Sequence, residues 1–283
     1  MSDGSSGPLW WAGLATGATR DRLTQDESVD VAIVGAGFTG LWAAYYLLEA
    51  DPSLKVLLLE AEHVGFGASG RNGGWVSALY PVGARVLARA HGEPATRDQY
   101  AALRESVDEV GRVAQAQGIE CGFHKGGTLV VATNRAQGTR ARAQVQESSY
   151  WGTGMTWLGA GAAAERLTVQ GLCGATFNPN CARIHPFRLA LGLARAIESK
   201  GARIHERTRV ASVERRVLRS DQGSSFGLAM SSGPPRPGLP GCPAIVAPWH
   251  PSTRWSSPQH PCRSRSGTRS AWPMPRRSVS IGT

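Results

Sequence analysis

Residues 29–40 of this 283-residue chain are Val-Asp-Val-Ala-Ile-Val-Gly-Ala-Gly-Phe-Thr-Gly. The apolar run at residues 29–35 predicts a buried strand, and the spacing of apolar residues over 39–50 predicts a helix. A second apolar run at residues 54–60 predicts another strand, of the kind found in a parallel sheet that is covered on both faces. This order of strand, helix and strand predicts an α/β fold.

The glycines between the first strand and the helix form a G-x-G-x-x-G motif, which is weak evidence alone but specific in this context. Gly35 permits a tight turn, Gly37 lets the backbone approach a pyrophosphate, and Gly40 allows the helix to pack closely on the strand. Phe38 and Thr39 then open the helix, whose positive end would meet the phosphates. We therefore predict a Rossmann-like dinucleotide site, the alternative being a plain strand-to-helix turn.

The second strand ends at Glu60, 20 residues after Gly40. A carboxylate at this place would accept hydrogen bonds from an adenosine ribose, and it would repel a 2′-phosphate, so NADP is disfavoured. A solvated strand end is the alternative for Glu60. The small residues that follow, around a single arginine, indicate a backbone that passes close to a flat, phosphate-bearing ligand. This loop favours FAD over NAD, and its candidate cofactor contacts are Ala61, Ser69, Gly70, Arg71, Asn72, Gly73 and Gly74.

We expect four parts in the chain: an N-terminal arm and FAD-binding βαβ unit at 1–90, a partial α+β substrate domain at 91–180, a return to the FAD-binding domain at 181–216, and a disordered tail at 217–283. The elements expected after residue 90 are helices over 96–117, 134–151 and 186–200, and strands over 120–123, 127–133, 202–205 and 209–213.

Residues 31–40, Glu60 and the run Gly-Ala-Ser-Gly-Arg-Asn-Gly-Gly at 67–74 together resemble the signatures of the D-amino-acid oxidase family, also called the glycine oxidase or DadA-like family. With Pro-Leu-Trp-Trp-Ala at residues 8–12, the chain is most similar to the gamma-glutamylputrescine oxidase branch. The resemblance covers about residues 8–215. It implies FAD as cofactor, with the backbone of Val210 facing the adenine, although Val210 would equally suit a plain core strand.

The resemblance also implies a reaction. Family members transfer a hydride from the carbon beside a neutral amine to the flavin, with oxygen as the usual electron acceptor, so we expect an amine or amino-acid substrate. No catalytic residue can be assigned. His124 and Lys125 would face the substrate cavity unless they serve an ordinary turn, and Trp75 either lines that cavity or packs in the core.

The C-terminal part differs in composition from the rest. Residues 217–283 hold 11 of the 17 prolines, no lysine, and eight arginines with one acid, which accounts for +7 of the chain's net charge of +10. A segment without apolar periodicity cannot offset its ordering entropy by burial. We interpret it as an out-of-frame or truncated continuation, so that a non-functional fragment is one alternative. A basic tail that binds nucleic acid or a membrane surface is another, although no nucleic-acid partner is our expectation.

Composition limits the remaining function classes. The apolar share of 41% suits a globular chain with a buried core. Five scattered cysteines predict free thiols and no metal site. Residues 41–48 form the most apolar helical stretch and are too short to cross a membrane. The polar start of the chain does not resemble a secretory signal, so we expect a cytoplasmic location.

Overall fold

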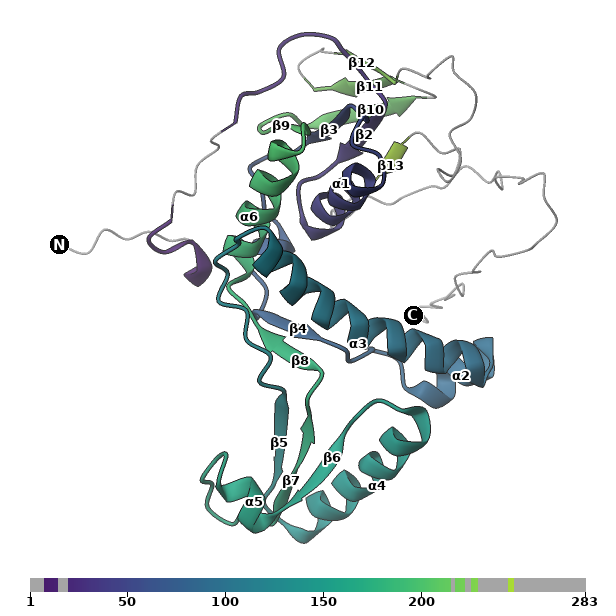
Figure 1. The fold of residues 1–283 in the computed structure, drawn as a ribbon, viewed down its shortest axis with the longest axis vertical. Helices are drawn as coiled ribbons and strands as arrows, with labels where there is room; N and C mark the ends of the chain where they lie inside the picture. Colours follow the sequence, from purple (N-terminus) through teal and green to yellow (C-terminus); the bar gives the residue numbers. More distant parts are fainter. Residues whose placement is uncertain (1–7, 15–19, 215–216, 222–224, 229–243, 247–283) are drawn as a thin grey trace, which may run out of the picture. The chain divides into compact units, whose positions relative to one another are not determined.

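A computed structural model of the chain describes residues 8–14, 20–214, 217–221, 225–228 and 244–246. Its central feature is a four-stranded parallel sheet in the order β13-β2-β3-β9 (Figure 1). The strands are β2 (Val31–Val34), β3 (Val56–Leu59), β9 (Arg203–His205) and β13 (Ala244–Val246). The helix α1 (Phe38–Ala50) connects β2 to β3, which confirms the predicted βαβ unit and the α/β fold.

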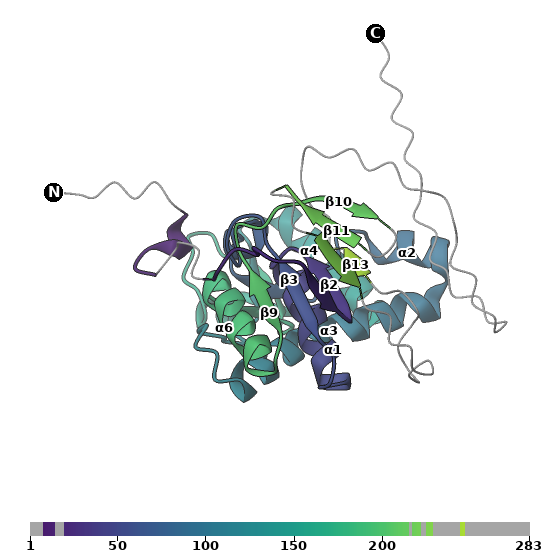
Figure 2. The same cartoon turned by 90° about the horizontal axis from the view of Figure 1, so that it is seen from above.

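Both faces of this sheet are covered, as the apolar strands predict. Val56 and Leu58 of β3 face a core shared with α1 and with α6 (Pro186–Ser199), whereas Leu57 and Leu59 face a second core. Figure 2 shows the two helices on one face and the strands β10 and β11 on the other. All four residues of β3 are buried, and side chains of this kind contribute roughly 1.5–3 kcal/mol each when fully buried.

The second core is closed by a four-stranded sheet of the order β1-β12-β11-β10. Its strands are β1 (Glu27–Val29), β10 (Val210–Glu214), β11 (Val217–Ser220) and β12 (Ser225–Leu228). Leu218 of β11 is fully buried in that core.

Three strands nevertheless lie within residues 217–283, the segment expected to be a disordered tail. β11 and β12 pair as an antiparallel hairpin, and β13 pairs with β2 in parallel. These strands are short, and the pairing of β13 with β2 joins segments distant in sequence, so the local sequence pattern did not predict them. The other residues of 217–283 lie outside the described part of the chain, apart from Asp221, whose amide donates to the carbonyl of Arg209.

The predicted α+β region begins with two helices, α2 (Ala84–His91) and α3 (Glu93–Ala116). An antiparallel pair of β4 (Trp75–Ser77) and β8 (Cys181–Arg183) leads to a three-stranded sheet of the order β5-β7-β6 (Figure 1). The strands of this sheet are β5 (Thr128–Ala132), β6 (Thr156–Gly159) and β7 (Gly174–Asn178), with α4 (Arg135–Trp151) and α5 (Ala160–Ala164) beside them.

Most of the predicted elements of this region are present, and one is not. Asn134 caps α4 as expected, because its side chain accepts a hydrogen bond from the amide of Gln137. Residues 120–123 do not form the predicted strand. The amide of His185 donates to the carbonyl of Cys121, and a single bridge joins His124 to Arg183. The segment is thus a loop held between α3 and α6, in which Cys121 is buried and Phe123 is half-buried.

Candidate functional site

The turn between β2 and α1 has the geometry that a close ligand approach requires. Gly35 has a φ of +96°, in the region that favours glycine. A Cβ added to Gly40 would lie 2.1 Å from the carbonyl oxygen of Gly35, so only glycine lets the helix start this close to the strand. The first turn of a helix leaves N–H groups without helical partners, and here those groups lie beside the end of a buried strand.

Glu60 lies at the carboxyl end of β3, directly beside this turn. Its Oε2 accepts a hydrogen bond of 2.7 Å from the amide of Ala36, and its Oε1 accepts one of 3.0 Å from the amide of Glu62. Each carboxylate oxygen can accept a further hydrogen bond, and the side chain is only half-buried. The two backbone donors fix the carboxylate, and its remaining acceptor capacity suits hydroxyl donors such as those of a ribose.

The glycine-rich loop lies against the same turn. The hydroxyl of Ser69 accepts a hydrogen bond of 2.8 Å from the amide of Phe38, the first residue of α1. A Cβ on Gly37 would lie 2.9 Å from the same hydroxyl oxygen. The amide of Gly65 also donates to the carbonyl of Ala36, with 3.1 Å between nitrogen and oxygen. The structure thus brings together the turn, Glu60 and Ser69, which the sequence places up to 34 residues apart.

Within the loop, the polar side chains bind the loop itself. Arg71 is exposed and donates from Nε to the carbonyl of Phe66 over 2.6 Å. Asn72 donates from Nδ2 to the carbonyl of Ser69 over 2.9 Å and accepts from the amide of Gly74 over 2.8 Å. These contacts stabilise one loop conformation, and a contact of Arg71 with the cofactor stays a prediction.

The glycines of the loop divide into two kinds. A Cβ on Gly70 would lie 2.2 Å from the carbonyl oxygen of Gly65 and 3.0 Å from the ring of Phe187 on α6, so Gly70 is required by packing. Gly73 is exposed and has nothing within 4 Å of the place where a Cβ would stand. Its backbone is therefore open to a neighbouring molecule.

Ala61 and Val210 complete the predicted set. Ala61 follows Glu60 and is half-buried. Val210 begins β10, is half-buried, and packs against the core formed with Leu59 and Leu218. The segment that leads to Val210 runs beside Glu60, because the amide of Thr208 donates to the carbonyl of Glu60 over 2.8 Å. The residues expected at the adenosine end therefore do lie on adjacent segments.

The residues present fit the adenosine and pyrophosphate parts of FAD. The helix start offers backbone donors, Gly73 leaves the loop backbone accessible, and Glu60 supplies acceptors at the strand end.

The family model described as DAO, FAD dependent oxidoreductase, matches residues 30–233. The chain belongs to this family. Among curated proteins it is 30% identical over 194 residues to gamma-glutamylputrescine oxidoreductase of Escherichia coli (strain K12), a match over 69% of this chain and 45% of that protein. It is 31% identical over 189 residues to a probable oxidoreductase, OrdL, of Haemophilus influenzae, over 66% of this chain and 43% of that protein. The chain thus spans less than half the length of these relatives.

Solved structures show the same fold. Glycine oxidase from Geobacillus kaustophilus matches with a TM-score of 0.55 and 24% identity, covering 78% of this chain and 55% of that one. L-amino acid deaminase from Proteus myxofaciens matches with a TM-score of 0.61 and 16% identity, covering 76% of this chain and 46% of that one.

The match to the family model ends at residue 233, and β11 and β12 lie within it. The family region therefore extends further than the predicted limit near residue 215.

Three side chains were expected at a substrate cavity, and the structure describes the surroundings of each. Lys125 forms an ion pair with Asp108 of α3. His124 is exposed, and its backbone makes the bridge to Arg183. Trp75 is 66% exposed, so it does not pack in the core of the described chain. Whether it lines a cavity stays a prediction.

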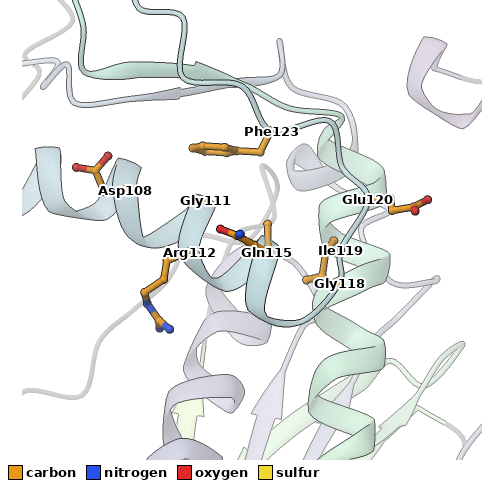
Figure 3. A pocket seen from close by; sticks show the side chains of 9 residues that line it. Asp108, Gly111, Arg112, Gln115, Gly118, Ile119, Glu120 and Phe123 are labelled. Carbon is orange, nitrogen blue, oxygen red and sulfur yellow. The ribbon is translucent and has the colours of Figure 1, made fainter.

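A pocket of about 600 Å³ lies away from the glycine turn, between the end of α3 and the loop that follows it (Figure 3). Phe123 lies over Gly111 in this pocket, where a Cβ would stand 2.5 Å from its ring. Arg112 also lines it, but its guanidinium donates to Glu109 over 2.6 Å from both Nε and a terminal nitrogen. Glu109 in turn accepts from the hydroxyl of Tyr46 on α1 over 2.6 Å. The charge of Arg112 is thus neutralised within α3, and the hydroxyl of Tyr46 extends this contact to α1.

One part of the site, an N-terminal turn that contains two tryptophans, was not predicted from the sequence. A short helical turn, η1 (Leu9–Trp11), contacts the glycine-rich loop through both of its tryptophans. The only signal in the sequence was the Trp-Trp pair itself, which marked the family branch without indicating a contact.

Further expectations concern groups elsewhere in the chain. Cys121, Cys173 and Cys181 are free thiols as predicted, and Cys242 and Cys262 lie outside the described residues. Within the described part, no cluster of three or more histidines, cysteines or acids could hold a metal. No described helix has the length and apolar character that a membrane crossing requires.

Proposed function

We propose that this chain binds FAD through the turn at Gly35–Gly40, Glu60 and the loop at Ser69–Gly74, as the cofactor domain of an enzyme that oxidises a C–N bond of an amine or amino acid. The observation that carries the proposal is the convergence of Glu60 and Ser69 on the same glycine turn, where Glu60 contacts Ala36 and Ser69 contacts Phe38. A carboxylate beside a helix N-terminus suits the ribose and the pyrophosphate of a dinucleotide.

The chain's own residues have defined tasks in this proposal. Glu60, held by the amide of Ala36, accepts from ribose hydroxyls, and the helix start binds the phosphates. Ser69 and Asn72 hold the loop against that helix start. When bound, FAD supplies the acceptor for the hydride that leaves the carbon beside the amine. None of the described residues is assigned a catalytic role.

The substrate class is supported by the relatives. A gamma-glutamylputrescine oxidoreductase shares 30% of the aligned residues, and a glycine oxidase has the same fold. Both names refer to amines or amino acids, and we extend that class to this chain. Oxygen as electron acceptor, the absence of a nucleic-acid partner and the cytoplasmic location stay predictions.

The visible absorption spectrum of the purified full chain tests the proposal. Flavin bands at close to one FAD per chain, lost in a Glu60→Ala variant, are the expected result. A colourless chain that also fails to quench the fluorescence of added FAD would overturn the proposal.

A second candidate is a fragment that cannot keep its cofactor. It is favoured by the apolar side chains at Trp75, Leu79 and Val86, which are 66%, 55% and 57% exposed, and by the greater length of the relatives. Exposed apolar surface of this kind promotes association. This candidate predicts aggregation on gel filtration and no bound flavin, whereas the first predicts a yellow protein in a single peak.

A further inference from the structure

The turn Leu9–Trp11 is attached to the glycine-rich loop by a hydrogen bond from Trp10. Its indole Nε1 donates to the carbonyl of Asn72, with 2.6 Å between the two atoms. The Trp10 ring also meets the ring of His185 edge to face, with 5.0 Å between the centroids. A Cβ on Gly74 would lie 3.3 Å from the Trp10 ring. Trp10 thus contacts both the loop and the residue that caps α6.

Trp11 holds the preceding loop residue by a different interaction. The guanidinium carbon of Arg71 lies 4.7 Å from the centroid of the Trp11 ring and 4.3 Å from that of Phe66. The Trp11 ring itself packs against Phe187 of α6, with 5.8 Å between the centroids. A cation at this distance from an aromatic ring is attracted to the face of that ring. Arg71 is therefore held although its side chain is exposed.

These contacts fix two consecutive residues of the loop from outside it. Asn72 accepts from Trp10 at its carbonyl and donates to Ser69 with its side chain, and Ser69 accepts from the start of α1. A continuous set of hydrogen bonds therefore runs from the N-terminal turn to the helix start that is proposed to bind phosphate. Its members are separated by up to 62 residues in sequence.

We propose that Trp10 and Trp11 are positioning residues that hold the loop at 66–74 in the conformation that receives the cofactor. The consequence for FAD rests on the proposed function, whereas the placement of the loop does not. Neither tryptophan is assigned a contact with FAD. Their effect passes through Asn72 and Arg71, so removing either tryptophan changes the loop without removing any group from the glycine turn.

The test compares hydrogen exchange of the peptide at 66–74 in the full chain with FAD affinity measured by fluorescence quenching. Trp10→Phe removes one hydrogen bond and keeps an aromatic ring, and Trp11→Leu removes the stack on Arg71. Each should speed exchange of this peptide about fivefold, the effect of losing roughly 1 kcal/mol. Each should also weaken FAD binding by a similar factor. Trp11→Phe keeps an aromatic ring beside Arg71, so it should retain most of the wild-type exchange protection and most of the wild-type FAD affinity.

The matched control is Trp157→Leu. Trp157 on β6 has Arg142 stacked on its ring at 4.4 Å, the same interaction at a place remote in sequence from the loop. Trp157→Leu should leave both the hydrogen exchange of residues 66–74 and the FAD affinity as in the wild-type chain.

Two results would overturn the proposal. One is wild-type exchange at 66–74 in both Trp10→Phe and Trp11→Leu. The other is an equal loss of protection across α1 and α6, because that loss indicates a general decrease in stability. If the wild-type chain binds no FAD, the proposed function fails, and the exchange comparison still decides the placement of the loop.

Discussion

The carboxylate of Glu60 accepts a hydrogen bond from the backbone amide of Ala36, with 2.7 Å between Oε2 and the nitrogen. A single residue therefore supports the turn and supplies acceptors to the proposed ligand. Glu60→Ala should lower the free energy of unfolding by about 1.5 kcal/mol, the value of a hydrogen bond to a charged group. It should also weaken FAD binding at least about tenfold, a loss of roughly 1.4 kcal/mol. Urea unfolding and flavin titration measure the two effects.

Glu62→Ala is the control for that variant. Glu62 is exposed, and its side chain pairs with Arg209 at 3.3 Å, a surface ion pair that contributes about 0–1 kcal/mol. Equal effects of the two substitutions on FAD affinity would contradict the special role of Glu60.

Gly40→Ala should prevent α1 from starting where it does. The new Cβ would lie 2.1 Å from the carbonyl oxygen of Gly35, so the helix has to move away from β2. We expect a loss of about 3 kcal/mol or more, or an insoluble product, because overpacking of this kind forces a backbone shift. Gly67→Ala is the matched control, since nothing lies within 4 Å of its Cβ position. A thermal melt that shows similar midpoints for the two variants would contradict the role of Gly40.

His185 should make the stability of the chain depend on pH. Its Nδ1 accepts a hydrogen bond of 3.2 Å from the amide of Arg188, which only a neutral ring with its proton on Nε2 can do. Burial, with the nearby charge of Arg188, lowers the pKa of His185 below its usual 6.5. The unfolded chain therefore takes up the proton first. The contribution of this cap is fully present above the unfolded pKa and is lost as pH falls through it towards the lower folded pKa.

The measurement is the urea unfolding midpoint near pH 8 and near pH 5, for the wild type and for His185→Asn. The contribution of the His185 cap is the part of the pH-dependent change that the variant does not show. Asparagine caps a helix without titrating, and a cap contributes about 1 kcal/mol. The wild type should lose more stability than the variant on acidification. An equal loss in both would show that another group controls the acid response.

The carboxyl group of Glu109 should titrate far below the usual range of a glutamate. Hydrogen bonds from Arg112, and then from Tyr46, lower the pKa of Glu109 to about 2. Because this pKa is depressed on folding, the associated stability is present above the unfolded pKa and is lost as pH falls towards about 2. Tyr46→Phe should raise the pKa of Glu109, and Arg112→Gln should raise it further. The carbon chemical shift of the Glu109 carboxyl group reports both values, and a midpoint near 4.5 in the wild type would contradict the contact.

The parts of the fold that could be predicted are those with a local cause. The apolar residues of β2 and β3 predicted a parallel sheet covered on both faces, and that sheet is present. The small residues at 67–74 predicted a backbone close to a phosphate-bearing ligand, which stays a prediction. The loop at 120–123 misled because its apolar side chains fill the space between α3 and α6 without a strand partner. α2 was not predicted, since its eight residues include two arginines and one histidine and bury only Ala84.

The unpredicted part of the site has a common physical reason. The contacts of Trp10 with Asn72 and of Trp11 with Arg71 join segments about 60 residues apart, and no periodicity reports such contacts. The same holds for β13, whose three residues gain a strand partner in β2 within a segment rich in proline. Ser69 was named as a cofactor residue from the loop composition, but its hydrogen bond to the start of α1 became visible only in the fold.

The pairing of β2 with β13 has a consequence for how the chain is made. β2 obtains one neighbour, β3, soon after it leaves the ribosome, but the other neighbour follows roughly 210 residues later. At about 5–20 residues per second, translation leaves one edge of β2 unpaired for roughly 10–40 s. The strand that leads into the cofactor turn is therefore the one that nascent chains expose longest, and a chaperone that binds extended apolar segments would find it during that interval.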